Sequence, residues 1–543
     1  MTHITGGAAI VQSLIKLGVD TIFALPGVQN DHFFNALYEH TDHIRVIHTR
    51  HEQGAAYMAM GYSQSTGKPG VYCVVPGPGF LNTTGALSTA YAVGAKVLCL
   101  TGQIPSDAIG KGIGLLHEIP DQLSVIRSLT KWAERIDSPE AAPGLVTEAF
   151  SQLYSGRPRP VGLEVPMDIL AKSGDVDLTV VEPEVRQPEL DLDAIDQAAR
   201  LLGKAKNPVI FVGGGAMDSG EAITELAEML QAPIIPGRNG RGVVSNAHPL
   251  SMMGPDGYEP WGKADVAIGL GTRMYTQLNR WGLDDDLKVI RVDIDPNEHD
   301  IVAPPAVKLV SDVEATTRAL IEALRKYNPA RASRTEEYLA HRAAKQQEYA
   351  QLEPQVSFIK AIREALPDDG LFVDEVTQIG FVSRFTLPVY QPRSYISTGY
   401  QGTLGFGFAT ALGVKVGNPD RPVLAVSGDG GFMFNVQELS SAMRHQINLV
   451  TVVFADGAFG NVRRMQKMDY GGKLIASDLY NPDFVKLAEA FGVLGMRAET
   501  PDELRAAIEK GFAANHPTLI EVPVGEMPSP WRISFAPPNR GKK

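Results

Sequence analysis

The chain is poor in cysteine, with only Cys73 and Cys99 among its 543 residues. Each lies in an apolar run, so we interpret both as core thiols, which excludes a disulfide framework and a cysteine metal site. The first residues, MTHITGGAAIVQSLIKLGVD, lack a basic region and a continuous apolar stretch. This argues against a signal peptide and a membrane span, and a cytoplasmic protein is the expectation.

The chain also lacks a basic excess, because 50 Lys and Arg face 62 Asp and Glu, for a net charge of −12. The acids are spread along the chain, which argues against nucleic acid and membrane surfaces as main partners. Hydrophobic residues make up 44% and charged residues 21%, as is typical of a globular protein. No short repeat is present, and the length exceeds what one core supports, so we expect three domains.

Apolar runs alternate with helical patterns in three segments, which predicts three consecutive α/β domains with mostly parallel sheets. Thr5 is expected to cap the first helix. Residues 171–193 are polar and rich in proline, and residues 329–353 are rich in Glu, Arg, Gln and Ala. We expect the first stretch to be a linker and the second to be a solvated helix that joins domains. The predicted boundaries are 1–170, 190–328 and 354–528, followed by an extended tail at 529–543.

The strongest motif is a glycine-rich turn between two apolar runs. Val423–Val426 leads into Gly428–Gly431, and Leu449–Phe454 leads into Asp456. Glycines let backbone N–H groups approach a phosphate at the start of a helix. Asp429 adds a carboxylate there, and Mg²⁺ is the cation that carboxylates and phosphates share. Because parallel strands end at one edge of a sheet, we expect Asp429 and Asp456 to lie together. The alternative is a tight turn with two helix-capping acids.

This unit resembles the GDG motif of the thiamine diphosphate-dependent enzymes, in particular their acetolactate synthase-like and 2-oxoacid decarboxylase branch. The resemblance implies that Asp429, Asp456 and the backbone carbonyl of Ala458 hold Mg²⁺ against the diphosphate. The chain departs from the family in having Ala455-Asp456 in place of Asn-Asn, which keeps an oxygen ligand and adds a negative charge. The order of α/β segments is similar to the family's pyrimidine-binding, central and diphosphate-binding domains over nearly the whole chain.

The resemblance also implies further cofactor contacts. Glu52, in IHTRHEQGAAYMAMGY, matches the glutamate that hydrogen-bonds the pyrimidine ring and activates the cofactor. The alternative for Glu52 is a first-turn acid that stabilises a helix dipole. Leu404, in GYQGTLGFG, matches the apolar residue under the cofactor, and a core leucine is the alternative. The other implied cofactor-binding residues are Thr377, Gln378, Gly402, Gly428, Gly430, Gly431 and Phe459.

The substrate side carries a weaker pattern. Gln29 follows a strand and a Pro-Gly turn, and Gln103 ends another strand, so both are candidate catalytic residues. His117 lies in a glycine-rich loop where decarboxylase relatives carry histidines, although a lone loop histidine is usually solvated. Phe80 is a candidate for the pocket wall, with core packing as the alternative.

The resemblance implies an enzyme that uses thiamine diphosphate and Mg²⁺ to break or form C–C bonds on a 2-oxoacid or a related carbonyl compound. Acetolactate synthase-like carboligation is the leading expectation. The alternatives are a 2-oxoacid decarboxylase, a 2-hydroxyacyl-CoA lyase, a C–C hydrolase, a flavin-dependent oxidase of the same family and, in another class, a non-catalytic nucleotide-binding protein.

The central segment offers no firm nucleotide signature. Its GGGAMDSG stretch after a strand lacks the GxGxxG pattern, so FAD or ADP is possible but not expected. In the family, the glutamate of one chain meets the diphosphate site of another. The resemblance therefore implies a homodimer or homotetramer with active sites at the chain interface.

Overall fold

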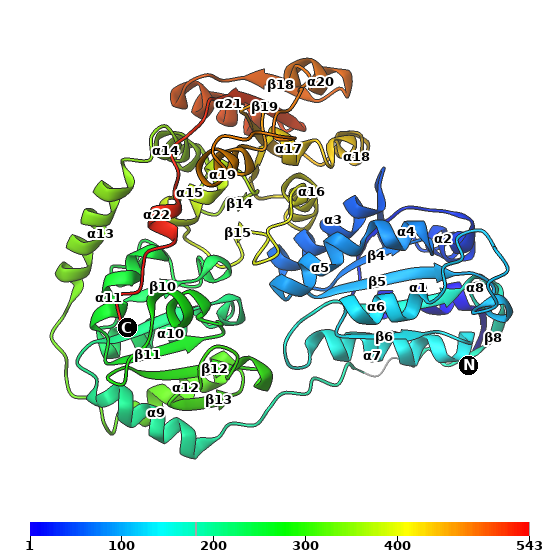
Figure 1. Ribbon diagram of the computed structural model, residues 1–543. Helices are drawn as coiled ribbons and strands as arrows, with labels where there is room; N and C mark the ends of the chain where they lie inside the picture. Colours follow the sequence, from blue (N-terminus) through cyan, green and yellow to red (C-terminus); the bar gives the residue numbers. More distant parts are fainter. Residues whose placement is uncertain (180–181, 542–543) are drawn as a thin grey trace.

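The computed structural model describes residues 1–179 and 182–541, which form three α/β domains (Figure 1). Each domain has a parallel sheet with helices packed against it, which confirms the predicted fold class. Within these described residues, no helix is both long and apolar enough to cross a membrane.

The N-terminal domain contains a six-stranded parallel sheet of order β3-β2-β4-β5-β7-β6. Its strands are β2 (Thr21–Ala24), β3 (Arg45–His48), β4 (Gly70–Val74), β5 (Val97–Gln103), β6 (Trp132–Arg135) and β7 (Val161–Pro166). Its helices are α1 (Gly6–Lys16), α2 (Asp31–Tyr38), α3 (Glu52–Thr66), α4 (Pro78–Asn82), α5 (Thr84–Val93), α6 (Gln122–Leu129), α7 (Ala142–Tyr154) and α8 (Met167–Ala171). Thr5 caps α1 as predicted, because its Oγ1 accepts the N–H of Ala8.

One predicted boundary is wrong. Residues 171–193 were expected to form a linker, but they begin with strand β8 (Ser173–Val176), which pairs antiparallel with β1 (Thr2–Thr5). Both strands are short and largely polar, so neither carries an apolar run or a clear alternation. Their pairing also joins segments far apart in sequence, which local patterns do not report.

The central domain has a five-stranded parallel sheet of order β10-β9-β11-β12-β13 and its own hydrophobic core. Its strands are β9 (Pro208–Val212), β10 (Ile234–Pro236), β11 (Val266–Leu270), β12 (Lys288–Asp293) and β13 (Val307–Val310). Its helices are α9 (Leu192–Lys204), α10 (Gly220–Leu230), α11 (Tyr258–Lys263) and α12 (Val313–Leu324). Helix α13 (Thr335–Tyr349) follows, within the segment predicted to be a joining helix.

The C-terminal domain has a second six-stranded parallel sheet, of order β15-β14-β16-β17-β19-β18. Its strands are β14 (Leu371–Val373), β15 (Tyr395–Ile396), β16 (Val423–Gly428), β17 (Val450–Ala455), β18 (Leu494–Arg497) and β19 (Thr518–Pro523). Its helices are α14 (Gln355–Ala365), α15 (Gln378–Thr386), α16 (Phe406–Gly417), α17 (Asp429–Phe432), α18 (Leu439–His445), α19 (Gly460–Asp469), α20 (Phe484–Ala490) and α21 (Pro501–Ala514).

The tail crosses back to the central domain. It contains the short helix α22 (Trp531–Ser534), so it is not extended throughout as predicted. Beyond this helix, the Arg540 guanidinium is buried against the central domain, where Nε donates to the carbonyl of Trp261 at 2.8 Å. Arg540 Nη1 also pairs with Asp284 at 2.6 Å. The last described residues therefore fasten the third domain to the second.

Helices α3 and α16 bring the N- and C-terminal domains into one packed unit (Figure 1). A Cβ on Gly61 would lie 2.1 Å from the carbonyl oxygen of Thr410, and a Cβ on Gly413 would lie 1.9 Å from that of Met58. Only glycine permits such an approach of two helix backbones. One hydrophobic core runs across this contact and reaches both sheets, so the start of α3 lies against the C-terminal domain.

Candidate active site

Two acids stand at the carboxyl ends of neighbouring parallel strands. Asp429 directly follows β16 and Asp456 directly follows β17, and the two strands pair as far as Gly428 and Phe454. Asp429 is buried, and its Oδ2 accepts the N–H of Gly457 at 2.8 Å and the side-chain amide of Asn481 at 2.6 Å. The structure therefore fixes one oxygen of Asp429 by neutral donors.

The two carboxylates form an electrostatically unfavourable pair. Burial raises the pKa of Asp456, and the charge of Asp429 raises it further. Gln378 opposes this by donating from Nε2 to Asp456 Oδ2 at 2.7 Å. A divalent cation between the carboxylates would relieve the repulsion, so the residues fit a Mg²⁺ site. No group of three or more His, Cys, Asp or Glu side chains suited to a metal occurs in the described chain. Further oxygens would come from the backbone, as predicted for Ala458, or from a ligand.

The glycine turn and three predicted cofactor residues lie together. Gly428 is the last residue of β16 and Asp429–Gly431 belong to α17, and a Cβ on Gly428 would lie 3.2 Å from Thr377 Oγ1. A Cβ on Gly430 would lie 2.7 Å from the ring of Phe459. Gln378 reaches the same place through Asp456. The hydroxyl of Thr377, the amide of Gln378 and the ring of Phe459 thus lie around the glycine turn, whose backbone N–H groups a phosphate can approach closely.

The segment before α16 carries Gly402 and Leu404. Gly402 has φ +60° and open space where a Cβ would stand, and Leu404 is half-buried. Gly405 is held close to Phe434, and its carbonyl accepts the side-chain amide of Asn435. Because residues 434–435 follow the glycine turn closely in sequence, this packing brings the Gly402–Leu404 segment to the same end of the sheet.

A buried glutamate that the sequence analysis missed lies under the glycine turn. Glu375 is fully buried and accepts the N–H of Gly407 at 2.8 Å and that of Val376 at 3.1 Å. Burial raises its pKa to about 7. A Cβ on Gly431 would lie 3.2 Å from its carboxyl carbon. The available signal was its place two residues after the end of β14, at the sheet edge where ligands bind.

Glu52 is the first residue of α3, at the edge of the N-terminal sheet. Its Oε2 accepts the side-chain amide of Asn82 at 3.0 Å, and its Oε1 lies near Gly79. Among the described residues, Glu52 makes no hydrogen bond or ion pair with Asp429 or Asp456. The structure thus gathers the predicted diphosphate residues in one domain and holds the predicted pyrimidine residue in another.

A second missed glutamate fixes the backbone just before Glu52. Glu438, from the C-terminal domain, is fully buried, and its Oε1 accepts the N–H groups of His51 at 3.0 Å and Arg50 at 3.2 Å. Gly54 leaves room for this carboxylate, because a Cβ there would lie 2.7 Å from Glu438 Oε1. No local pattern in the sequence distinguishes Glu438 from a solvated helix glutamate.

Gln29 and His117 lie together on the N-terminal domain. Gln29 Nε2 donates to the carbonyl of Leu116 at 3.1 Å, and Gln29 Oε1 is buried without a partner among the described residues. His117 has φ +69°, and its Nδ1 is likewise buried without a described partner. A Cβ on Gly77 would lie 2.3 Å from the carbonyl oxygen of His117, which requires glycine there. Phe80 is fully buried and belongs to the core.

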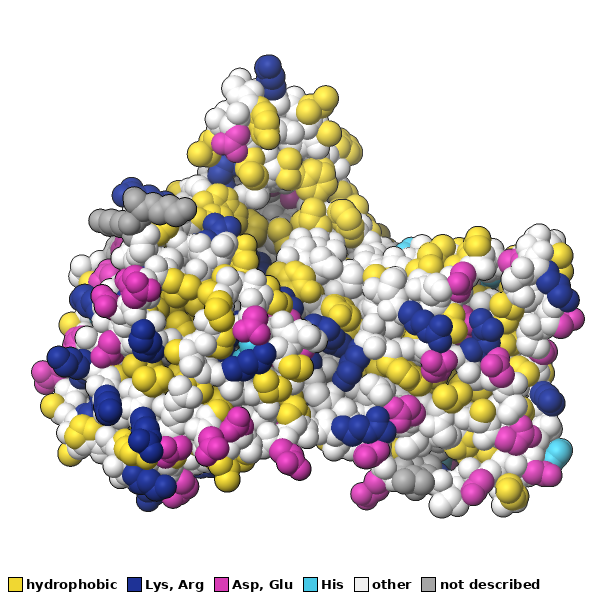
Figure 2. Space-filling model, turned by 60° about the horizontal axis from the view of Figure 1, so that its bottom comes forward, with side chains coloured by type: hydrophobic (Ala, Val, Ile, Leu, Met, Phe, Trp, Pro, Cys, Tyr) yellow, Lys and Arg dark blue, Asp and Glu magenta, His cyan; other side chains and the backbone are white. Residues whose placement is uncertain are grey.

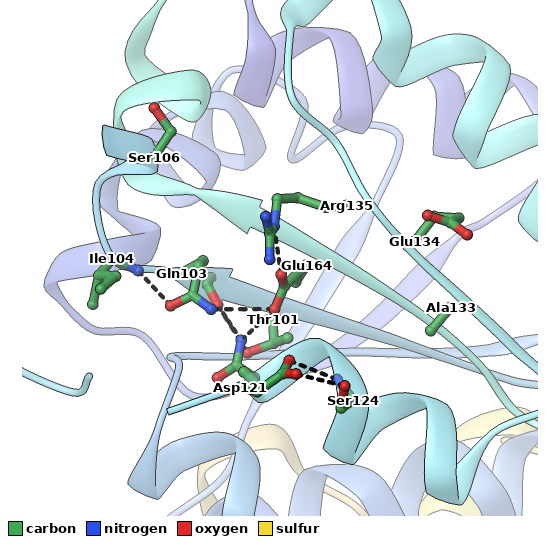
Figure 3. A network of polar contacts seen from close by, with 12 residues as sticks. Thr101, Gln103, Ile104, Ser106, Asp121, Ser124, Ala133, Glu134, Arg135 and Glu164 are labelled. Carbon is green, nitrogen blue, oxygen red and sulfur yellow. Dashed lines mark hydrogen bonds and ion pairs between the residues drawn. The ribbon is translucent and has the colours of Figure 1, made fainter. Parts of the chain in front are cut away.

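Gln103 belongs to a different group of side chains (Figure 3). Its Nε2 donates to Glu164 at 3.2 Å, and its Oε1 accepts the N–H of Ile104 at 2.8 Å. Glu164 is fully buried and also receives Gln122 Nε2 at 3.2 Å and Arg135 Nε at 2.6 Å. The structure therefore does not bring the Gln103 side chain into contact with Gln29 or His117.

Loops that follow strands of the central sheet are engaged with the protein itself. Arg273 pairs with Glu298 at 2.7 Å, and Arg157 of the N-terminal domain pairs with the same carboxylate. A Cβ on Gly213 would lie 2.2 Å from the carbonyl oxygen of Gly271. The expectation that FAD is not required stays a prediction.

Comparisons with known proteins match all three domains. Residues 4–125 match the N-terminal TPP binding domain of the thiamine pyrophosphate enzymes, residues 195–320 the central domain, and residues 375–522 the C-terminal TPP binding domain. The chain is 34% identical to a probable 2-ketoarginine decarboxylase of Pseudomonas aeruginosa, over 96% of this chain and 94% of that protein. It is 32% identical to the acetolactate synthase isozyme 2 large subunit of Escherichia coli, over 97% of both. It is 31% identical to a probable acetolactate synthase large subunit of Methanocaldococcus jannaschii, over 95% of this chain and 91% of that protein.

Proposed function

Because the chain belongs to the thiamine pyrophosphate enzyme family, we propose that it breaks and forms C–C bonds on a 2-oxoacid with Mg²⁺ and thiamine diphosphate, by acetolactate synthase-like carboligation. When bound, the cofactor supplies a carbon nucleophile and an electron sink. The observation that carries the proposal is the pair Asp429 and Asp456, whose mutual repulsion a bound cation would relieve beside a glycine turn.

Each residue near this pair has a defined task in the proposal. The carboxylates of Asp429 and Asp456 and the carbonyl of Ala458 hold Mg²⁺. The N–H groups of the Gly428–Gly431 turn would bind the diphosphate, with Thr377 beside the turn. Gln378 keeps Asp456 oriented through its 2.7 Å hydrogen bond. Gly402, Leu404 and Phe459 would contact the cofactor.

Glu52 holds a proton at the pyrimidine ring nitrogen, and the protein prepares its carboxylate for this task. Asn82 donates to one carboxylate oxygen at 3.0 Å and limits its rotation. Glu438 fixes the two preceding backbone N–H groups from the other domain. Positioned general acid–base groups contribute about 10²–10⁴-fold to rates.

The substrate-facing groups decide between carboligation and decarboxylation. The amide of Gln29 has an unpartnered Oε1 and can orient a substrate without acting as a strong acid. This favours joining the bound fragment to a second carbonyl compound. His117 supports the second candidate, 2-oxoacid decarboxylation, because its buried, unpartnered Nδ1 could deliver a proton to the fragment. A relative of the chain is named a probable 2-ketoarginine decarboxylase.

Product analysis tests the proposal. The purified protein with thiamine diphosphate, Mg²⁺, pyruvate and an aldehyde should form more carboligated product than free aldehyde. Aldehyde alone, from pyruvate or from 2-ketoarginine, would favour decarboxylation. Consumption of an acyl-CoA with no 2-oxoacid would favour the lyase. A yellow protein with a flavin spectrum would favour the oxidase. His117→Gln should lower the aldehyde fraction if the histidine delivers the proton.

We propose that two chains complete the site. Large apolar side chains are exposed beside both halves: Val28, Leu81 and Leu116 flank the Glu52 side, and Phe434, Val462 and Met465 flank the Asp456 side. On the face in Figure 2, hydrophobic side chains gather on the C-terminal domain, while charges of both signs cover the other two. Light scattering should give a dimer or tetramer, and a fully active monomer would refute the shared site.

A further inference from the structure

A hollow of about 260 Å³ opens at the carboxyl end of the N-terminal sheet, beside Gln103. Its lining includes Ile104, Ile109, Ile119, Asp121 and Arg135. The isoleucines supply apolar wall, and the two charged residues supply polar groups of opposite sign. Asp121 and Arg135 lie close enough for the guanidinium to help lower the pKa of the carboxyl, after its hydrogen bonds with Ser124.

The Arg135 guanidinium has N–H donors that are not used within the described residues. Buried Glu164 accepts Nε at 2.6 Å and is further satisfied by the amides of Gln103 and Gln122 (Figure 3). Nη1 and Nη2 of Arg135 make no hydrogen bond to any residue in the described ranges, and neither is sealed from solvent. Held by Nε alone, the guanidinium presents its forked end, the edge that matches a carboxylate.

We propose that this hollow binds a small monocarboxylate with a short apolar chain. Its carboxylate would accept from Arg135 Nη1 and Nη2, and its chain would cover the isoleucines. Glu164 keeps its negative charge and offsets part of the charge of Arg135, but it accepts only Nε of the guanidinium, so Nη1 and Nη2 remain available to the ligand's carboxylate. Two sources share the chemistry: a 2-oxoacid, and an α-amino acid whose ammonium group would reach Asp121.

The hollow is connected to the predicted substrate side. Both ends of the loop that carries His117 line it, through Ile109 and Ile119. Gln122, in its wall, accepts the N–H of Gly77 at 2.9 Å, and Gly77 packs under the carbonyl of His117. We therefore expect an occupant to fix the His117 loop, whose Gly110, Gly112 and Gly114 all have positive φ. The effect on turnover rests on the proposed function, whereas binding itself does not.

The test is calorimetric titration of the protein, loaded with thiamine diphosphate and Mg²⁺, with 4-methylvalerate, which lacks the 2-oxo group and does not react as a 2-oxoacid. The alcohol 4-methylpentan-1-ol is the uncharged control ligand. We expect the acid to bind at least about 10-fold more tightly, since charge-assisted hydrogen bonds are lost with the alcohol. Leucine and 4-methyl-2-oxovalerate then identify the source by which of them binds more tightly.

Two variants separate this site from the catalytic one. Arg135→Gln removes the fork, and Ile119→Trp fills the hollow while leaving the Arg135–Glu164 pair in place. Each should weaken 4-methylvalerate binding at least about 10-fold. Arg127→Gln is the matched control, because Arg127 pairs with Glu134 outside the hollow, and binding should be unchanged. Hydrogen exchange of residues 104–121 should slow on binding in the wild type only. Equal affinity in Ile119→Trp and wild type, or no binding up to about 10 mM, would overturn the proposal.

Discussion

The N- and C-terminal sheets have the same strand order but different chemistry at their carboxyl ends. When the strands of each sheet are numbered from 1 to 6 in chain order, both sheets have the spatial order 2-1-3-4-6-5. After its third strand, the N-terminal sheet is followed by Gly77–Phe80 and the C-terminal sheet by Asp429–Phe432. Each of these segments ends in a fully buried phenylalanine. After the fourth, one presents Ile104 and the other Asp456. One topology thus builds two sites, and the acids decide which can hold a metal.

The two helices that follow the second strands also correspond. α3 and α16 exchange the same contact, Gly61 against Thr410 and Gly413 against Met58. The reciprocity indicates that the two domains are related by an approximate twofold rotation about this helix pair. The arrangement places Glu52 at the start of one helix and Leu404 just before the other, so equivalent positions carry different parts of the predicted site.

The largest effect is expected from removing Asp429, the acid of the C-terminal sheet that we propose as a metal ligand. Asp429→Ala should abolish Mg²⁺-dependent retention of thiamine diphosphate, measured by equilibrium dialysis, because Asp456 alone offers one carboxylate. Asp456→Asn should be mild, since an amide oxygen remains. Asp420→Ala, at an exposed loop acid of the same domain, is the control. Tight binding of cofactor and metal by Asp456→Ala would show that Asp456 is not a ligand.

The corresponding test of the N-terminal sheet is Glu52→Gln. The variant should fold and bind cofactor but lose about 10²–10⁴-fold in turnover, because an amide cannot hold the proton that the carboxylate holds. The readout is turnover in the product assay, with cofactor affinity measured in parallel. Glu39→Gln, at an exposed acid after α2, should keep full activity. Near wild-type turnover in Glu52→Gln would remove Glu52 from the mechanism.

Alanine at the reciprocal glycines should weaken the helix pair. Gly61→Ala and Gly413→Ala each place a methyl group about 2 Å from a backbone carbonyl, so we expect a loss of about 1–3 kcal/mol in the free energy of unfolding. Urea midpoints measure this. Gly144→Ala in α7 has open space and should stabilise by up to about 1 kcal/mol. If the two contacts are equivalent, the two losses should be similar, and a loss at one glycine alone would break the symmetry.

The smallest effect concerns acid pH at the contact between His445 and His48. The backbone N–H of His48 donates to His445 Nε2 at 3.1 Å, which requires a neutral ring. Burial, then the charge of His48, lowers the pKa of His445 to about 4, and Arg45 and Arg444 act in the same direction. In the unfolded chain His445 binds a proton below about pH 6.5, whereas in the folded chain it stays neutral down to about pH 4. The contribution of this contact to the free energy of unfolding is therefore complete above about pH 6.5 and declines as the pH falls towards about 4.

We expect this decline to be under about 1 kcal/mol per pH unit, because His445 is partly exposed. His445→Gln should flatten the dependence of the urea midpoint between pH 7 and pH 5. His516→Gln, at a partly exposed histidine of the same domain whose Nε2 lies 3.0 Å from the carbonyl oxygen of Gly492, should leave it unchanged. An unchanged slope in His445→Gln would show that other groups carry the acid sensitivity.

Much of the fold could be predicted because many of its strands are continuous runs of buried apolar residues. The apolar run Val423–Val426 lies in β16, and the run Leu449–Phe454 overlaps β17. The pairing of β1 with β8 escaped prediction because two short polar strands carry no pattern.

The candidate site was predictable only where its residues follow strands. Asp429 and Asp456 stand out because each ends an apolar run. Glu375 also follows a strand and could have been found by the same argument. Glu438 could not, because its burial depends on Arg50 and His51, nearly 400 residues away in sequence. The partners of Gln103 could not be predicted for a similar reason, since Glu164 and Arg135 come from two other strands.

The return of Arg540 to the central domain bears on how the chain folds. Arg540 lies 279 residues beyond Trp261, whose carbonyl it binds. The central sheet is thus synthesised long before the residue that fastens it, and it must reach its own structure unaided. A contact that closes so long a loop forms late. Interactions absent from the transition state slow unfolding without speeding folding. In stopped-flow experiments, Arg540→Ala should therefore unfold faster than the wild type and refold at the wild-type rate. The tail would thus stabilise the folded protein kinetically, by slowing its unfolding.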